Sequence, residues 1–248
     1  MSVAELTVRP EAPVLNLSDV ALFLDLDGTL APIVSRPDDV GPDPRRTGLL
    51  ERLQSRLEGR LAVVSGRTLA DLDRILETSV PALAGVHGLA RRNGGGELST
   101  APGHPGHDAA LAALNAFAAD RPGLIVEDKG LSVALHYRLA PELAAAARHE
   151  AERVAARSGL TLQEGQMVAE LRSPGETKGD SVRAFMAEPP FAGARPVFVG
   201  DDLTDEDGFL AAEALGGFGV LVGPPRPTAA RFRLPDVETA LVWLEHSQ

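Results

Sequence analysis

The sequence predicts an α/β protein, and three observations lead to this fold class. From residue 20 onward, short apolar runs alternate with segments of helical periodicity, which is typical of a parallel sheet with intervening helices. Glycine and proline cluster within residues 93–106, where this rhythm stops, and the rhythm resumes at Lys178. Together these features predict a Rossmann-like parallel-sheet core carrying an inserted, smaller α+β cap domain.

The first half of the core is predicted from apolar patterning. Val20, Ala21, Leu22, Phe23 and Leu24 form a continuous apolar run, as in a strand buried on both faces. The next predicted elements are a helix carrying leucines at 49, 50, 53 and 57, a strand at 61–64, a helix at 69–76 and a strand at 82–86.

The insertion has a different rhythm, which predicts the order αββαββ. Its expected elements are a helix at 108–119, strands at 124–128 and 132–138, a helix at 141–158, and strands at 160–164 and 167–172. The core then continues with a helix at 178–187, a strand at 196–199, a helix at 206–215, a strand at 219–222 and a helix at 236–246. The predicted domains are an N-terminal extension (1–19), the core (20–102 and 173–248) and the cap (103–172).

Composition limits the class of function. The net charge of −11 argues against nucleic acid as a partner. The absence of cysteine excludes disulfides, thiolate zinc sites and cysteine-nucleophile chemistry. Residues 1–19 lack the pattern of a signal peptide, and no apolar stretch is long enough to span a bilayer. We therefore expect a cytoplasmic protein without a membrane partner.

Two carboxylates follow the first predicted strand, in the run Asp25-Leu26-Asp27-Gly28-Thr29-Leu30. Ligands of open α/β sheets bind at the carboxyl ends of strands, so Asp25 and Asp27 are candidate site residues. An ordinary Asp-rich turn is the alternative.

Two further motifs could bind phosphate. Ser65 and Gly66 follow the second predicted strand, where a hydroxyl and backbone amides at a helix start can hold phosphate oxygens. Lys178 begins the helix that reopens the core and could neutralise a phosphate or a carboxylate. A helix cap at Ser65 and a solvated side chain at Lys178 are the alternatives.

The last motif is acidic, because the run from Gly200 to Asp207 contains five carboxylates after an apolar strand. Packing like charges together is unfavourable without a cation, so the run indicates an oxygen-ligand site for Mg²⁺. The alternative, an acidic helix N-terminus favoured by the helix dipole, accounts for Glu206 and Asp207.

These four segments, in this order, resemble the haloacid dehalogenase superfamily. The resemblance implies Asp25 as a nucleophile that forms an aspartyl phosphate and Asp27 as the acid/base, with Ser65, Gly66 and Lys178 holding phosphate. It also implies Mg²⁺ held by Asp25, the Asp27 carbonyl and Asp201, with Asp202 and Asp205 orienting the metal shell.

Segments around His87, 127–138 and 168–179 are similar to the trehalose-6-phosphate phosphatase family. The resemblance implies hydrolysis of trehalose 6-phosphate to trehalose and phosphate, the final step of trehalose biosynthesis. It also implies contacts from the cap and the core to the sugar or the phosphate, at His87, Glu127, Lys129, His136, Arg138 and Glu170. For any one of these side chains, a polar exposed sheet face is the alternative.

Other functions stay open at this stage. The catalytic aspartates do not separate trehalose 6-phosphate from sucrose 6-phosphate or a phosphorylated mannosyl compound. A non-catalytic sugar-phosphate sensor, paired with a trehalose-phosphate synthase, would need the cap but not Asp25; the intact aspartates argue against it.

Overall fold

The computed structural model describes residues 9–248 and divides the chain into two compact units. The first unit contains the described residues up to Ser99 together with Thr177–Gln248, and the second contains Thr100–Glu176. The predicted insertion, 103–172, lies inside the second unit. In the described part of the chain, no helix has both the length and the apolar character needed to cross a membrane.

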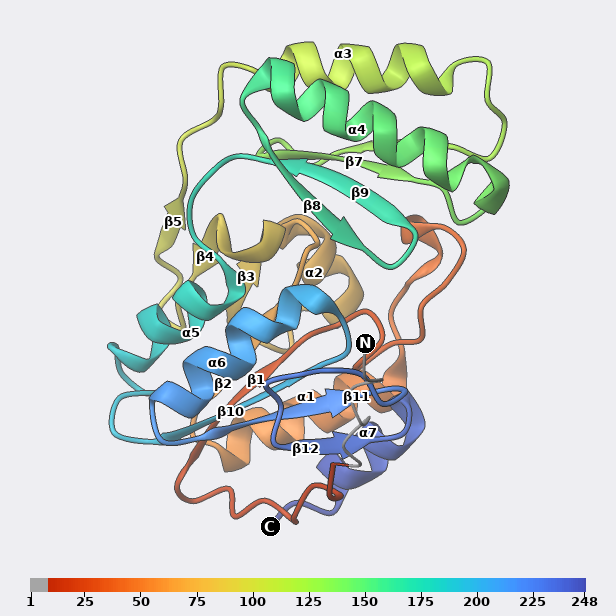
Figure 1. Ribbon diagram of the computed structural model, residues 1–248. Coiled ribbons are helices and arrows are strands. Elements are labelled where there is room, and N and C mark those ends of the chain that lie inside the picture. The colour runs from red at the N-terminus through yellow and green to blue at the C-terminus, as the bar shows by residue number, and fades with distance from the viewer. Residues whose placement is uncertain (1–8) are drawn as a thin grey trace. The chain divides into compact units, whose positions relative to one another are not determined.

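Eight strands form the sheet of the first unit: β1 (Val20–Leu24), β2 (Leu61–Val64), β3 (Ala82–Gly85), β4 (Ala90–Arg92), β5 (Leu98–Thr100), β10 (Arg195–Gly200), β11 (Phe218–Val222) and β12 (Phe232–Leu234). Their order is β12-β11-β10-β1-β2-β3-β4-β5 (Figure 1). Neighbours from β12 to β3 pair in parallel, and β4 is antiparallel to β3. Because β1 lies between β10 and β2, the carboxyl ends of these three strands meet at one edge.

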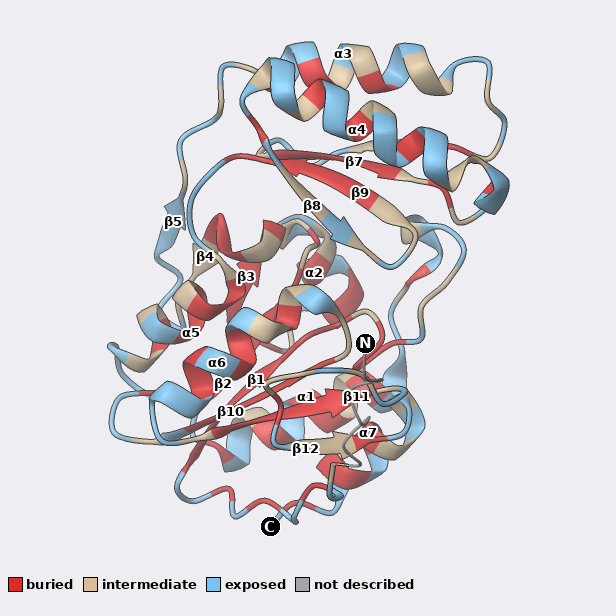
Figure 2. Cartoon of the chain, viewed as in Figure 1, coloured by how far each residue is buried: buried red, intermediate tan, exposed pale blue. Residues whose placement is uncertain are grey.

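Helices cover both faces of this sheet: α1 (Pro44–Arg56), α2 (Leu69–Leu76), α5 (Lys178–Met186), α6 (Glu206–Ala214) and α7 (Val237–Glu245). Alternate residues of β1 point to opposite faces. Leu22 and its alternate neighbours pack with α1, α2 and α7, whereas Ala21 and Phe23 pack with α5 and α6. Both faces of β1 are therefore buried, as its continuous apolar run predicts (Figure 2).

The largest departures from the predicted elements are at short segments and at a helix start. Helix α1 begins at Pro44, ahead of the first predicted leucine, because the Asp43 side chain accepts a hydrogen bond from the Arg46 amide and Pro44 suits the first turn. β4, β5 and β12 were not predicted, since each has only three residues. So short a strand shows no readable alternation of apolar and polar residues.

Part of the predicted N-terminal extension, 1–19, packs on the first unit. Its residues 1–8 lie outside the described residues. Leu15 and Leu17 are buried in the cluster that includes α1 and α7. Backbone hydrogen bonds join this segment to the end of the chain, from Leu17 N to Gln248 O at 2.5 Å and from Gln248 N to Leu15 O at 2.9 Å.

The second unit is an antiparallel sheet with helices on one face. Its strands β6 (Ile125–Asp128), β7 (Ser132–His136), β8 (Thr161–Gly165) and β9 (Val168–Arg172) lie in the order β6-β7-β9-β8. Helices α3 (His107–Ala118) and α4 (Ala144–Ser158) cover the face that carries Val133, Leu135 and Leu171 (Figure 1). The element order is the predicted αββαββ, and the predicted fold class is confirmed.

Short 3₁₀ turns complete the chain at η1 (Pro37–Asp39), η2 (Val86–Gly88), η3 (Pro141–Leu143) and η4 (Leu203–Asp205). Two of them lie next to the predicted site residues. η2 follows β3 and contains His87, and η4 joins the acidic run after β10 to α6.

Candidate active site

The first predicted motif lies directly after β1. The Asp25 amide donates to the Val199 carbonyl of β10 at 2.9 Å, which ties the start of the loop to the neighbouring strand. The loop then turns sharply at Gly28, whose φ is +80° and whose amide donates to the Ala31 carbonyl at 2.7 Å. Asp25 is buried, with 4% of its surface exposed.

Lys178 is buried against two of the predicted carboxylates. Its Nζ donates to Asp25 Oδ1 at 2.9 Å and to Asp205 Oδ1 at 2.6 Å. The Thr177 side chain caps α5 in a capping box with Asp180, so the helix start that positions Lys178 is well defined. Lys178 is 3% exposed, so its side chain is an ion-pair partner within the site and not a solvated surface group.

The acidic run after β10 folds around Asp205. Asp205 Oδ2 accepts hydrogen bonds from the amides of Asp201 and Asp202, each at 2.9 Å, while its other oxygen pairs with Lys178. The Asp201 carboxylate lies against the first motif, because a Cβ added to Gly28 would fall 2.1 Å from Asp201 Oδ2. A side chain at position 28 would therefore displace Asp201.

Three carboxylates of these segments form one cluster. Asp25, Asp201 and Asp205 each offer an oxygen, and these oxygens all lie within 4.8 Å of one another. Burial, together with the charges of Asp205 and Asp27, raises the pKa of Asp25 to about 8 despite the opposing charge of Lys178. Burial and the charges of Asp25, Asp205 and Asp202 raise the pKa of Asp201 to about 9.

The same carboxylates stabilise the charged form of Lys178. Burial alone would lower the pKa of Lys178, but the carboxylates of Asp205 and Asp25 raise it above its usual value. Lys178 is thus held as a cation, and one cation does not balance three clustered carboxylates, two of them buried and one partly buried. The chemistry of this donor set suits a further hard cation with oxygen ligands.

Asp27 is held by an arginine from the Ser65 loop. Arg67 Nε donates to Asp27 Oδ2 at 2.7 Å and Arg67 Nη2 donates to Asp27 Oδ1 at 2.8 Å. Arg67 Nη1 donates to the Pro37 carbonyl at 2.9 Å, so the guanidinium is fixed on a second side. This two-point pairing sets the orientation of the Asp27 carboxylate.

Ser65, Gly66 and His87 lie together. The Ser65 hydroxyl accepts from the Arg67 amide at 3.3 Å, while the cap of α2 is Thr68, so Ser65 is not the helix cap. A Cβ on Gly66 would fall 2.5 Å from His87 Nε2, which places the imidazole directly on this glycine. Val86 and His87 both have positive φ, at 48° and 57°, so the backbone that presents His87 is strained.

Three of the predicted sugar contacts of the second unit, Glu127, His136 and Glu170, share one sheet face. The register pairs Ala134 with both Glu127 and Glu170, which puts the two glutamates on the face opposite α3 and α4. His136 Nε2 lies 2.8 Å from Glu127 Oε2. Lys129 Nζ donates to Glu170 Oε2 at 2.9 Å, and the Ser132 hydroxyl donates to Glu170 Oε1 at 2.6 Å.

Arg138 and Glu127 complete this group. Arg138 Nη2 donates to the Gln166 carbonyl at 2.5 Å, in the turn between β8 and β9. Burial alone would raise the pKa of Glu127, but the hydrogen bond with His136 and the charge of Lys129 lower it below its usual range. The carboxylates of this face therefore have partners within the second unit.

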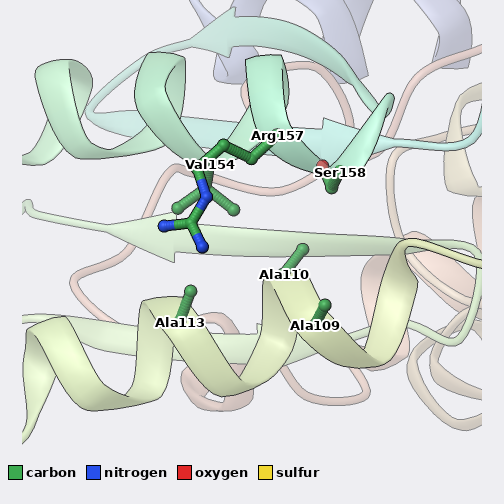
Figure 3. Close-up of a pocket in the computed structure, with 6 residues that line it drawn as sticks. All are labelled: Ala109, Ala110, Ala113, Val154, Arg157 and Ser158. Atoms are coloured by element: carbon green, nitrogen blue, oxygen red, sulfur yellow. The ribbon is translucent and has the colours of Figure 1, made fainter.

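A cavity of about 100 Å³ lies elsewhere in the second unit, between α3 and α4 (Figure 3). The Arg157 guanidinium reaches into the space between the two helices. None of the predicted site residues lines this cavity, whose walls are Ala109, Ala110, Ala113, Val154, Arg157 and Ser158.

Sequence reasoning missed Arg67 and Ser132 as members of these groups. Arg67 directly follows Ser65 and Gly66, so an arginine one residue beyond a candidate phosphate loop was an available signal. Ser132 lies two residues before Ala134 on β7, so its side chain is on the same sheet face as that of Glu170, the partner of Ala134. The alternation of side chains along a strand was therefore an available signal for Ser132. Glu206, ascribed above to the helix dipole, pairs with Arg226, whose loop carries no recognisable motif.

The fold is shared by a solved phosphatase of the HAD superfamily from Bacteroides thetaiotaomicron, which aligns with a TM-score of 0.61 and 14% identity, over 99% of this chain and 97% of that one. The trehalose-phosphatase family model matches residues 23–238. The chain belongs to the trehalose-phosphatase family.

Individual relatives agree with this assignment. A probable trehalose-phosphate phosphatase from Sinorhizobium fredii is 39% identical over 86% of this chain and 82% of its own length. A trehalose-6-phosphate phosphatase from Escherichia coli is 41% identical over 95% of this chain and 88% of its own. A solved trehalose-6-phosphate phosphatase related protein aligns with a TM-score of 0.73 and 28% identity, over 91% of this chain and 95% of that one.

Proposed function

We propose that this chain hydrolyses trehalose 6-phosphate to trehalose and inorganic phosphate, with Asp25 as the nucleophile. The observation that carries the proposal is the buried Asp25–Lys178 pair beside Asp201, at the carboxyl end of β1, in a chain of the trehalose-phosphatase family. Lys178 holds one oxygen of Asp25, which leaves the other oxygen of this carboxylate to react.

Mg²⁺ suits the donor set of this site. Asp25 and Asp201 would hold it with carboxylate oxygens and Asp27 with its backbone carbonyl. Asp205 is already committed to Lys178 and to two backbone amides, so its role is to orient the Asp201 loop. When bound, Mg²⁺ supplies positive charge that favours the ionised carboxylates and offsets the charge of the phosphoryl group.

The first half-reaction transfers the phosphoryl group to the protein. An oxygen of Asp25 forms a bond to phosphorus while the bond from phosphorus to the sugar oxygen breaks, which gives an aspartyl phosphate. For this step Asp27 must be protonated, with one of its oxygens released from Arg67, and it gives its proton to the departing sugar oxygen, so trehalose leaves as a neutral alcohol. Lys178 and the Ser65–Gly66 loop hold the oxygens of the transferred group.

The second half-reaction returns Asp25 to its starting state. Asp27, now a carboxylate, takes a proton from a water whose oxygen attacks phosphorus. The bond between phosphorus and the Asp25 oxygen breaks, inorganic phosphate leaves and Asp27 is protonated again. Arg67 keeps the Asp27 carboxylate in one orientation between the two steps.

Recognition of the sugar is assigned to the polar sheet face of the second unit and to His87. Glu127, Lys129, His136, Arg138 and Glu170 carry charged or hydrogen-bonding groups suited to sugar hydroxyls or to phosphate. His87 lies against Gly66 and so is placed for the phosphate end of the substrate.

The proposal is tested with the full chain and a panel of trehalose 6-phosphate, sucrose 6-phosphate and a mannosyl phosphate. We expect Mg²⁺-dependent phosphate release with the highest kcat/KM on trehalose 6-phosphate, loss of release in excess chelator, and recovery when Mg²⁺ is restored. A higher kcat/KM on another member would reassign the substrate. No release from any of them would point to a sugar-phosphate sensor paired with a trehalose-phosphate synthase.

A further inference from the structure

The loop that carries Asp201 is held on a second side by an arginine from a distant segment. Arg226, in the loop after β11, directs Nη2 to the carbonyl of Asp202 at 2.7 Å and to the carbonyl of Asp201 at 3.4 Å. These carbonyls belong to the residues whose amides donate to Asp205. The backbone of Asp201 and Asp202 is therefore hydrogen-bonded on both sides. Its amides donate to the Asp205 carboxylate, and its carbonyls accept from the Arg226 guanidinium.

Arg226 is itself fixed by Glu206, the first residue of α6. Its Nη1 pairs with Glu206 Oε1, and Glu206 Oε2 accepts from the Ala229 amide at 2.7 Å. Nη1 also donates to the Pro227 carbonyl at 3.1 Å. Glu206 thus ties both the arginine and its loop to the helix that follows the acidic run.

The pair is only partly exposed, with 21% of the Arg226 side chain and 24% of the Glu206 side chain accessible. A surface ion pair of two long side chains contributes little, but this guanidinium makes directional hydrogen bonds to a loop with fixed geometry. An ammonium group at the same place has no planar fork and could not keep all of these contacts.

The repulsion within the acidic cluster explains why the Asp201 loop needs this restraint. Oxygens of Asp25, Asp201 and Asp205 lie within 4.8 Å of one another, so like charges would drive the Asp201 loop away from Asp25 unless its backbone were restrained. Asp205 restrains the amides, and its own position depends on Lys178. A second restraint, independent of Lys178, would keep Asp201 in place during the reaction.

We propose that Arg226, fixed by Glu206, is a positioning residue that holds Asp201 in the geometry needed to bind Mg²⁺. This inference rests on the proposed function, because it assumes that Asp201 is a metal ligand. It adds a part of the chain in which no site residue was predicted, the loop 223–231, to the supports of the site.

Binding of Mn²⁺ provides a readout that does not depend on turnover. Mn²⁺ prefers oxygen ligands as Mg²⁺ does, and the free ion is counted by electron paramagnetic resonance as it is titrated into the full chain. The variants are Arg226→Met, Arg226→Lys and Asp201→Asn. The matched control is Arg91→Met, because Arg91 pairs with Glu188 at 2.7 Å with similar exposure, 17% and 35%.

We expect Asp201→Asn to abolish binding at the site and Arg226→Met to raise the Mn²⁺ dissociation constant by about tenfold or more. Arg226→Lys should give an intermediate value, because one ammonium replaces only part of the fork. Arg91→Met should bind Mn²⁺ as the unmodified protein does, although both arginine-to-methionine variants lower Tm.

Each other result has a defined meaning. Unchanged affinity in Arg226→Met, with binding lost in Asp201→Asn, would overturn the role of Arg226 and leave the metal site intact. Full Mn²⁺ affinity in Arg226→Lys would show that the positive charge is sufficient and would overturn the positioning role of the guanidinium. If Arg226→Met does not fold, the Mn²⁺ affinity of Arg226→Lys alone tests the proposal. Unchanged binding in Asp201→Asn would instead contradict the metal assignment of the proposed function.

Discussion

The two units of this chain differ in whether their clustered carboxylates have balancing partners. In the first unit, Asp25, Asp201 and Asp205 crowd together around one lysine, and burial with mutual repulsion raises the pKa values of Asp25 and Asp201 to about 8 and about 9. On the polar face of the second unit, Glu127 pairs with His136, and its pKa is lowered. Glu170 there has Lys129 and Ser132 as partners.

This difference separates two kinds of polar site. A cluster that lacks balancing charge is destabilising on its own, and it becomes favourable when a bound cation supplies the missing positive charge. A face whose charges are already paired is stable alone, and under the proposed function it exchanges these hydrogen bonds for contacts with sugar hydroxyls. We therefore expect substitutions in the first unit to affect the chemical step and those on the polar face to affect substrate choice.

The largest effect should come from Asp25→Asn. The amide keeps the shape of the side chain but cannot attack phosphorus, so kcat should fall by about 10⁴-fold or more on every phosphate ester. Loss of one of three crowded carboxylates should leave the fold intact, so circular dichroism and Tm serve as the control. Substantial turnover in a folded variant would break the assignment of the nucleophile.

Asp27→Asn should show a smaller effect that depends on the leaving group. Trehalose is a poor leaving group that needs a proton, so phosphorylation of Asp25 by trehalose 6-phosphate should slow by roughly 10²- to 10⁴-fold. An aryl phosphate, whose leaving group is stable as an anion, should lose far less at this step. Rapid-quench measurement of the rate of Asp25 phosphorylation in a single turnover checks this. Equal losses of this rate on both substrates would rule out Asp27 as the general acid.

Arg67→Lys should reproduce the leaving-group dependence of Asp27→Asn at a reduced size. The lysine keeps the charge but not the two-point pairing with Asp27, so we expect about a tenfold loss with trehalose 6-phosphate and a smaller one with an aryl phosphate. Combining both substitutions should cost little more than Asp27→Asn alone, because Arg67 acts through Asp27. Additive losses would show that Arg67 acts separately.

The features that could be predicted from the sequence are those determined by neighbouring residues in the chain. The apolar run from Val20 to Leu24 predicted β1, and β1 in turn places Asp25 at the carboxyl edge of the sheet. Lys178 could be located because it opens a helix with a recognisable N-terminus. Such features depend on a few neighbouring residues and on the periodicity of one element.

Features that depend on residues distant in sequence could not be read in the same way. Arg67 and Asp27 are 40 residues apart, and the orientation of a guanidinium depends on how two loops meet. Arg226 lies 25 residues beyond Asp201 in a Gly-Pro-Pro-Arg-Pro segment without periodicity. Three-residue strands such as β12 are set by their neighbour in the sheet, not by their own pattern.

The most direct test of the division between chemistry and recognition uses Glu127→Ala, with Glu164→Ala as a control. Both remove a carboxylate from the second unit, but Glu164 lies on β8, with Arg148 as a distant partner at 3.9 Å. The measurement is the kcat/KM for trehalose 6-phosphate divided by that for a small aryl phosphate.

For Glu127→Ala we predict that this ratio falls by about 5- to 150-fold, because an unpaired polar group costs about 1 to 3 kcal/mol and the aryl phosphate never makes the contact. The ratio should stay unchanged in Glu164→Ala. Equal losses on both substrates in Glu127→Ala would contradict the account, because they would show that the polar face supports the fold or the catalytic step and does not select the sugar.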